Sequence, residues 1–234
     1  MKFPNAAKGI KKMFTAEILH LIGVILMIIA ASFAVVGLST AAIDVNNLPS
    51  TQNLSELFAG ANGTAAANLI LIGIGLVGIA FILYFIGFIL NLVGYINARH
   101  DGNEFLTALV FLLISIVFSA VYGFTIYNGI GGVMYSLATL CQTIATIFVI
   151  AGVVKLADRL NRGDVSSMGS NILKLLITIE VIAFVVSLIT TFMGGAVASV
   201  TAAILLLVAF ILSFIKYIMY LIFLAKAKQM LAEN

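Results

Sequence analysis

Long apolar runs alternate with short polar segments along the whole chain. The runs at residues 18–38, 69–96 and 202–215 contain no Asp, Glu, Lys or Arg. A helix needs about 20 apolar residues to cross a hydrocarbon layer of roughly 30 Å. The pattern therefore predicts an all-α integral membrane protein, a six-transmembrane-helix bundle within residues 15–230. The predicted helices cover about 15–39, 66–98, 105–125, 133–160, 170–192 and 196–230.

The six helices, taken in order along the chain, are expected to form three antiparallel hairpins. The second helix of each hairpin ends on an apolar run that closes with basic residues, at 92–99, 153–159 and 221–228. This likeness has two explanations, which we leave open. It is either an internal threefold hairpin repeat or the composition that helices share where they leave a membrane.

Two segments outside the six helices have patterns of their own. Residues 1–14 place apolar side chains at helical spacing with lysines largely elsewhere, which predicts an amphipathic helix lying in the membrane interface. We expect the following apolar run to be a retained helix, since it is longer than the core of a signal peptide. The polar outer loop, 40–64, predicts a short surface helix starting near Pro49.

Charge distribution then sets the orientation. Hydrophobic residues make up 63% of the chain and charged residues 9%, which is outside the range of soluble proteins. All twelve Lys and Arg residues fall in alternate connections, at the chain ends or near the helix ends beside them. By the positive-inside rule both termini are expected in the cytoplasm. The basic pI of 9.0 therefore indicates membrane orientation and contact with anionic lipids, and not nucleic-acid binding.

A few polar residues lie inside the predicted helices. Glu180 and Lys216 stand at similar depth on neighbouring helices, and Glu17, His20 and Asn91 lie at comparable or shallower depth. Because a charge at the bilayer centre costs about 3 kcal/mol on insertion scales, such residues usually face the bundle and pair. These five residues form either a polar pocket open to the cytoplasm or, for Glu180 and Lys216, a structural ion pair.

Small residues mark the predicted helix contacts. Gly73, Gly75 and Gly78 match the spacing of a dinucleotide-binding loop, but they lie inside an apolar helix with no preceding strand. Glycines there, and the pair Ala30 and Ala34, instead favour close packing of helices.

No catalytic motif, metal-ligating cluster or cofactor-binding loop is visible, so we do not expect an enzyme, a metal or a cofactor. The favoured interpretation is a small polytopic membrane protein that acts by interaction with lipids or membrane partners, as a subunit, immunity or stress protein. The alternative is a transporter, or a substrate-binding transporter subunit, built on Glu180, Lys216 and His20. Expected partners are the lipid bilayer and, as open alternatives, a membrane protein or a second copy in a homo-oligomer. The preference for Lys over Arg and the short loops favour a bacterial plasma membrane.

Overall fold

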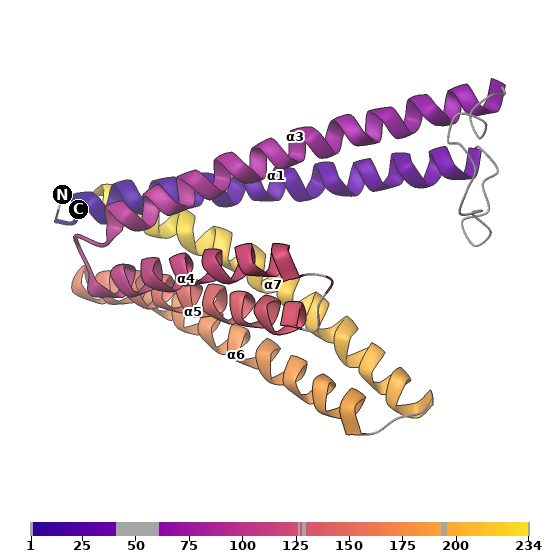
Figure 1. Ribbon diagram of the computed structural model, residues 1–234. Helices are drawn as coiled ribbons and strands as arrows, with labels where there is room; N and C mark the ends of the chain where they lie inside the picture. Colours follow the sequence, from indigo (N-terminus) through magenta and orange to yellow (C-terminus); the bar gives the residue numbers. More distant parts are fainter. Residues whose placement is uncertain (1, 41–60, 126, 128–129, 193–195, 234) are drawn as a thin grey trace. The chain divides into compact units, whose positions relative to one another are not determined.

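The computed structural model describes residues 2–40, 61–125, 127, 130–192 and 196–233. Within these residues the fold consists of six α-helices and contains no strand (Figure 1). This confirms the predicted fold class. The helices are α1 (Pro4–Thr40), α3 (Ala61–Ala98), α4 (Asn103–Thr125), α5 (Ile130–Arg159), α6 (Gly163–Phe192) and α7 (Ala196–Glu233).

All six helices are long and apolar enough to cross a membrane. Their most apolar stretches have mean hydropathies between 1.9 and 2.8. Even the shortest, α4 with 23 residues, measures about 35 Å at 1.5 Å per residue. Large apolar side chains point outward on these helices, as for Ile28 (62% exposed) and Phe81 (70% exposed). Such a surface suits hydrocarbon rather than water, so the chain is a multi-pass membrane protein.

The chain divides into two compact units, each described by itself. The two-helix unit is Thr15–Asn91, and the larger unit combines Met1–Phe14 with Leu92–Asn234. In the two-helix unit, α1 and α3 run antiparallel. A Cβ built on Gly23 would meet the ring of Tyr84, and one built on Gly37 would meet Ile70.

A row of small residues, which we call the small-residue seam, joins α1 to α3 in the two-helix unit. Its members are all buried and recur every seven residues on both helices. They are Ala16, Gly23, Ala30 and Gly37 on α1 and Ala66, Gly73, Ala80 and Gly87 on α3. A seven-residue period keeps one face of each helix turned to its partner, and small side chains let the two backbones approach closely.

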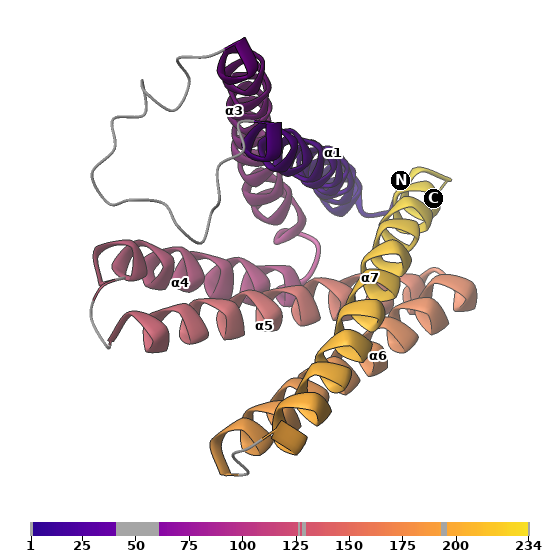
Figure 2. The same cartoon turned by 90° about the vertical axis from the view of Figure 1, so that its right-hand side faces the viewer.

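The core of the larger unit lies where most of its helix ends meet. Here α4 packs along α5, and α6 packs against both α5 and α7, as two views show (Figures 1 and 2). The rings of Phe105 and Phe223 are fully buried, and each lies against a glycine, Gly152 and Gly169 respectively. These contacts join consecutive helices, but they do not test a threefold hairpin repeat, which stays a prediction.

Two helix boundaries differ from the sequence-based ones. Residues 1–14 are not a separate helix, because residues 10–22 contain no Gly or Pro that would interrupt the continuous α1. At the second boundary, α6 begins at Gly163 instead of near Ser170. Its polar first turns extend the helix beyond the apolar run. The short helix predicted near Pro49 falls on residues 41–60, outside the described residues.

Candidate functional site

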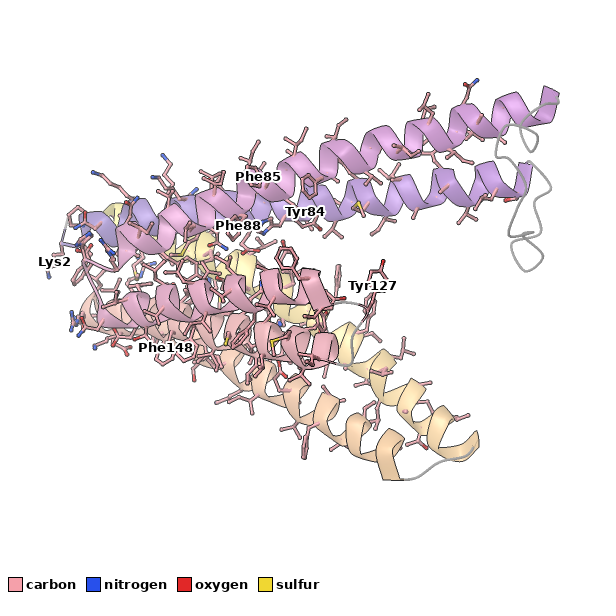
Figure 3. The ribbon with its side chains drawn as sticks, in the orientation of Figure 1. Lys2, Tyr84, Phe85, Phe88, Tyr127 and Phe148 are labelled. Carbon is pink, nitrogen blue, oxygen red and sulfur yellow. The ribbon has the colours of Figure 1, made fainter. Side chains whose placement is uncertain are left out.

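Positive charge is confined to the larger unit, which holds all twelve Lys and Arg residues. We call the end of this unit where α1, α4 and α6 begin and α3, α5 and α7 end the basic end. Figure 3 shows side-chain nitrogens gathered there, around the labelled Lys2. The basic end carries Lys2, Lys8, Lys11, Lys12, Arg99, Lys155, Arg159, Arg162, Lys226 and Lys228. The other two, Lys174 on α6 and Lys216 on α7, lie farther from this end.

The N-terminal part of α1 is fixed onto the basic end. Its apolar face is buried in the core of the larger unit, with Ala6, Ile10 and Met13 at most 1% exposed. The carboxylate of Asp101 accepts hydrogen bonds from the backbone N–H of Ala6 (2.7 Å) and from Nδ2 of Asn5 (3.2 Å). A carboxylate there satisfies an otherwise unpaired N–H and complements the helix dipole. The predicted contact of residues 1–14 with the membrane interface stays a prediction.

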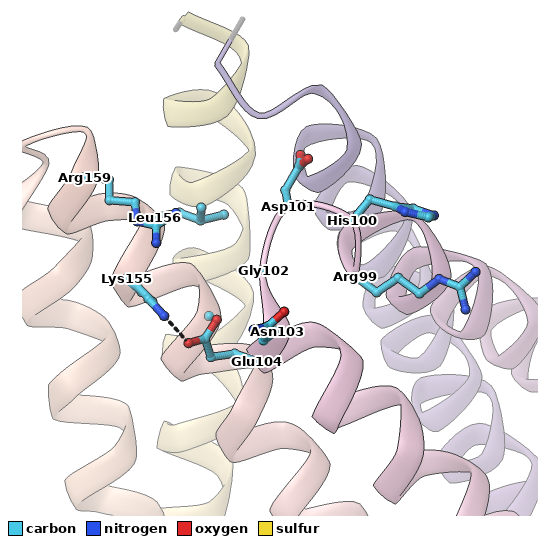
Figure 4. Close-up of a pocket in the computed structure, with 10 residues that line it drawn as sticks. Arg99, His100, Asp101, Gly102, Asn103, Glu104, Lys155, Leu156 and Arg159 are labelled. Atoms are coloured by element: carbon cyan, nitrogen blue, oxygen red, sulfur yellow. Dashed lines mark hydrogen bonds and ion pairs between the residues drawn. The ribbon is translucent and has the colours of Figure 1, made fainter.

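A pocket of about 250 Å³, which we call the loop pocket, opens beside this cap. It lies between the connection from α3 to α4 and the last turns of α5 (Figure 4). Its lining residues are Arg99, His100, Asp101, Gly102, Asn103, Glu104, Gly152, Lys155, Leu156 and Arg159. Lys155 and Arg159 extend from α5, whereas the side chains of Arg99 and His100 point to the other side of the connection (Figure 4).

One ion pair crosses the loop pocket. Nζ of Lys155 lies 2.5 Å from Oε1 of Glu104, and the two side chains are 51% and 22% exposed. Arg159 forms no ion pair with any residue that the structure describes. Among the described residues, the N–H groups of Gly102 and Asn103 also have no hydrogen-bond acceptor. The pocket thus combines a guanidinium that has no direct ion pair, and feels the Glu104 carboxylate only at longer range, with unsatisfied backbone donors.

Arg162 provides the contrast to Arg159 at the same end. The backbone turns after α5 through Asn161, whose φ is 55°, and Arg162 N–H bonds to the carbonyl of Ala157 (2.8 Å). This closing turn is a common helix end. The guanidinium of Arg162 then pairs with Asp164 and with Glu233 of α7, each at 3.1 Å. The hydrogen bonds that Arg162 donates to the carboxylate of Asp164 raise the pKa of Arg162 above its ordinary value.

Three of the five predicted pocket residues belong to the two-helix unit. Nδ1 of His20 lies 3.8 Å from Oε2 of Glu17, and the His20 ring stacks on Tyr84 with centroids 5.5 Å apart. Gly87 leaves the space beside His20 that this stack needs, as Gly23 does beside Tyr84. Figure 3 labels Tyr84 on α3, and Asn91 lies two turns farther along that helix, half-buried.

The remaining two, Glu180 and Lys216, belong to the larger unit. Glu180 is exposed on α6, Lys216 is half-buried on α7, and among the described ion pairs none joins them. The contact of Gly169 with Phe223 sets the register of α6 against α7 and places the two residues about one turn apart in height. The five residues are thus divided between the two units, and a single pocket made from them stays a prediction.

The predicted packing residues separate into two sets. A Cβ on Gly73 would lie 3.1 Å from the carbonyl oxygen of Ala30 and 3.8 Å from the backbone N of Ala34. Gly75 and Gly78 have nothing within 4 Å of a built Cβ, so they face away from α1. The small-residue seam was not predicted from the sequence, although its seven-residue spacing is visible there. Arg99, Lys155 and Arg159 were predicted only as basic helix ends and not as the lining of a pocket.

Comparison of the chain with known protein families, curated proteins and solved structures finds no match.

Proposed function

We propose that this multi-pass membrane protein acts without catalysis, by binding anionic lipid headgroups at its basic end. One observation carries the proposal: every Lys and Arg lies in the larger unit, and all but Lys174 and Lys216 lie at one end of it. The two-helix unit, by contrast, has no basic residue.

The basic end carries enough charge for a substantial attraction to an anionic membrane surface. A basic residue near an anionic membrane surface contributes about 1 kcal/mol, and the attraction decays within a Debye length of about 8–10 Å. Lys8 and Lys11 stand exposed on the same N-terminal turns whose apolar face is fixed to the protein. Such side chains meet headgroups without any ordering of the backbone, which lowers the entropic cost of binding.

The same charges support an orientation. By the positive-inside rule the basic end faces the cytoplasm, in a plasma membrane that we propose is bacterial. Tyr127, between α4 and α5 at the opposite end, is 98% exposed and serves as an outside marker. In a Cys141→Ser background, Tyr127→Cys should react with an impermeant maleimide in intact cells, and Lys2→Cys only after permeabilisation. The reverse pattern would contradict the orientation.

Lipid binding itself is tested with purified full-length protein in mild detergent. Native mass spectrometry with equal phosphatidylglycerol and phosphatidylcholine should show adducts dominated by phosphatidylglycerol. A variant with Lys8 and Lys11 replaced by Gln should lose part of this preference. Equal retention of both lipids by the wild-type protein would refute the proposal.

A second candidate, transport of a small solute, is favoured by one observation. Glu17, His20 and Tyr84 form a polar cluster within apolar membrane-spanning helices, and polar groups at such depth commonly mark substrate or proton pathways. If transport is the role, His20→Ala should abolish uptake of a candidate solute into proteoliposomes while leaving the lipid preference unchanged.

A further inference from the structure

The loop pocket gives the basic end a defined shape in addition to its positive charge. Its walls come from two elements, the connection before α4 and the last turns of α5. Part of its lining is tightly packed, because Gly152 lies against the fully buried ring of Phe105. The backbone of this part of the wall is therefore held in place by the core, whereas Lys155 and Arg159 are exposed side chains that reach in from α5.

We infer that the loop pocket binds a phosphate group, with the guanidinium of Arg159 as its main cationic partner. This inference rests on the proposed function and names the site and chemistry within it. Arg159 forms no ion pair with the described residues and feels Glu104 only at longer range, so its guanidinium donors are available, and such donors match the geometry of phosphate oxygens. The N–H groups of Gly102 and Asn103 supply further donors at the first turn of α4.

The acidic side chains of the pocket set the strength of this site. Asp101 already accepts a hydrogen bond from the backbone N–H of Ala6 at the start of α1, so it stabilises the wall of the pocket. Glu104 instead pairs with Lys155 and also attracts Arg159 at longer range, so its carboxylate competes with an incoming phosphate for both cations. Two substitutions in one pocket therefore act with opposite sign: loss of Arg159 weakens phosphate binding, and loss of the Glu104 charge strengthens it.

Arg162 is the matched control. It belongs to the same basic end and also extends from the region after α5, but it does not line the pocket and it is paired with Asp164 and Glu233. Arg159→Gln and Arg162→Gln remove the same formal charge from the same end. Only the first removes a group from the loop pocket.

The experiment titrates the full-length protein in mild detergent with short-chain phosphatidic acid and follows adducts by native mass spectrometry. We expect Arg159→Gln to weaken binding about tenfold, which is typical for the loss of one charged hydrogen-bond partner. Arg162→Gln should change it less than twofold, and Glu104→Gln should strengthen it severalfold. A parallel arm adds inorganic phosphate: displacement of the lipid identifies a soluble phosphate compound as the ligand, and no displacement identifies a lipid headgroup.

Two results would overturn the inference. Equal losses for Arg159→Gln and Arg162→Gln would mean that only the overall charge matters, so the pocket fails while the proposed lipid preference stands. Unchanged or weaker binding in Glu104→Gln would refute the site even if Arg159→Gln did not fold. If wild-type protein shows no preference for anionic over zwitterionic lipid, the proposed function itself fails.

Discussion

Gly73 and Gly75 provide a test of the small-residue seam within one helix. Gly73 is buried against α1, and a Cβ there would lie 3.1 Å from the carbonyl oxygen of Ala30 and 3.7 Å from Cβ of Phe33. Gly75 has nothing within 4 Å of the same built atom. Substitution of each by Leu adds the same side chain to the same helix on two different faces.

The expected changes in stability of the two variants start from one contribution that both share, the gain in helix propensity. Both gain helix propensity, because Gly in a helix interior is less favourable than Ala by roughly 0.5–1 kcal/mol and Leu is close to Ala. Gly75→Leu should therefore raise stability by about that amount. Gly73→Leu must also push α1 away, because the oxygen of Ala30 is a backbone atom that cannot rotate aside. Overpacking of this kind costs about 1–3 kcal/mol. The difference between the two variants cancels the propensity gain and leaves about 1–3 kcal/mol.

The assay is reversible unfolding in mixed micelles of a mild detergent with increasing dodecyl sulfate. Tyrosine fluorescence is a suitable probe because the chain has seven Tyr and no Trp. Tyr84, stacked on His20 within the same helix pair, reports on this contact. Equal midpoints for Gly73→Leu and Gly75→Leu would refute the close approach of α1 and α3 at this level.

Three further predictions concern the basic end. Asp101→Ala should destabilise the start of α1 by about 0.5–2 kcal/mol, seen as faster hydrogen exchange at Ala6, whereas Asp101→Asn keeps an acceptor and should cost less. Phe105→Ala should lower the free energy of unfolding by about 3–5 kcal/mol, because it empties a fully buried site; a loss below about 1 kcal/mol would contradict the described core. Glu104→Gln should change stability by less than about 1 kcal/mol, because its pair with Lys155 is partly exposed, so a large loss would show that the pair is structural.

Much of the fold could be predicted because hydropathy dictates where a chain crosses a membrane. The six helices and their order follow from the apolar runs alone. The helix ends were harder, because a helix does not stop where its apolar surface stops. α1 passes through Phe14 without interruption, and the first turns of α6 carry Asp164 and two serines yet bury Val165 in the core. Hydropathy marks the change of surroundings at such points, not the end of hydrogen bonding.

The candidate site was predictable in its charge but not in its shape. The sequence shows that Arg99, Lys155 and Arg159 lie near helix ends on one side. It does not show that the connection before α4 folds against α5, because that contact depends on the burial of Phe105 against Gly152. Nor does it distinguish Arg159 from Arg162, since the partners of Arg162 include Glu233 at the far end of the chain. Pairing over such a separation is a property of the tertiary structure.

The stacked rings of His20 and Tyr84 determine how α1 and α3 are aligned along their lengths, which the small-residue seam alone does not. Because small residues recur every seven positions on α1 and α3, sliding one helix by one period would again bring small residues face to face. In either direction, however, Tyr84 would leave Gly23 and meet an alanine, Ala16 or Ala30, with no room for its ring. The aromatic pair therefore fits only one alignment of the two helices, whereas the repeat of small residues by itself is compatible with several.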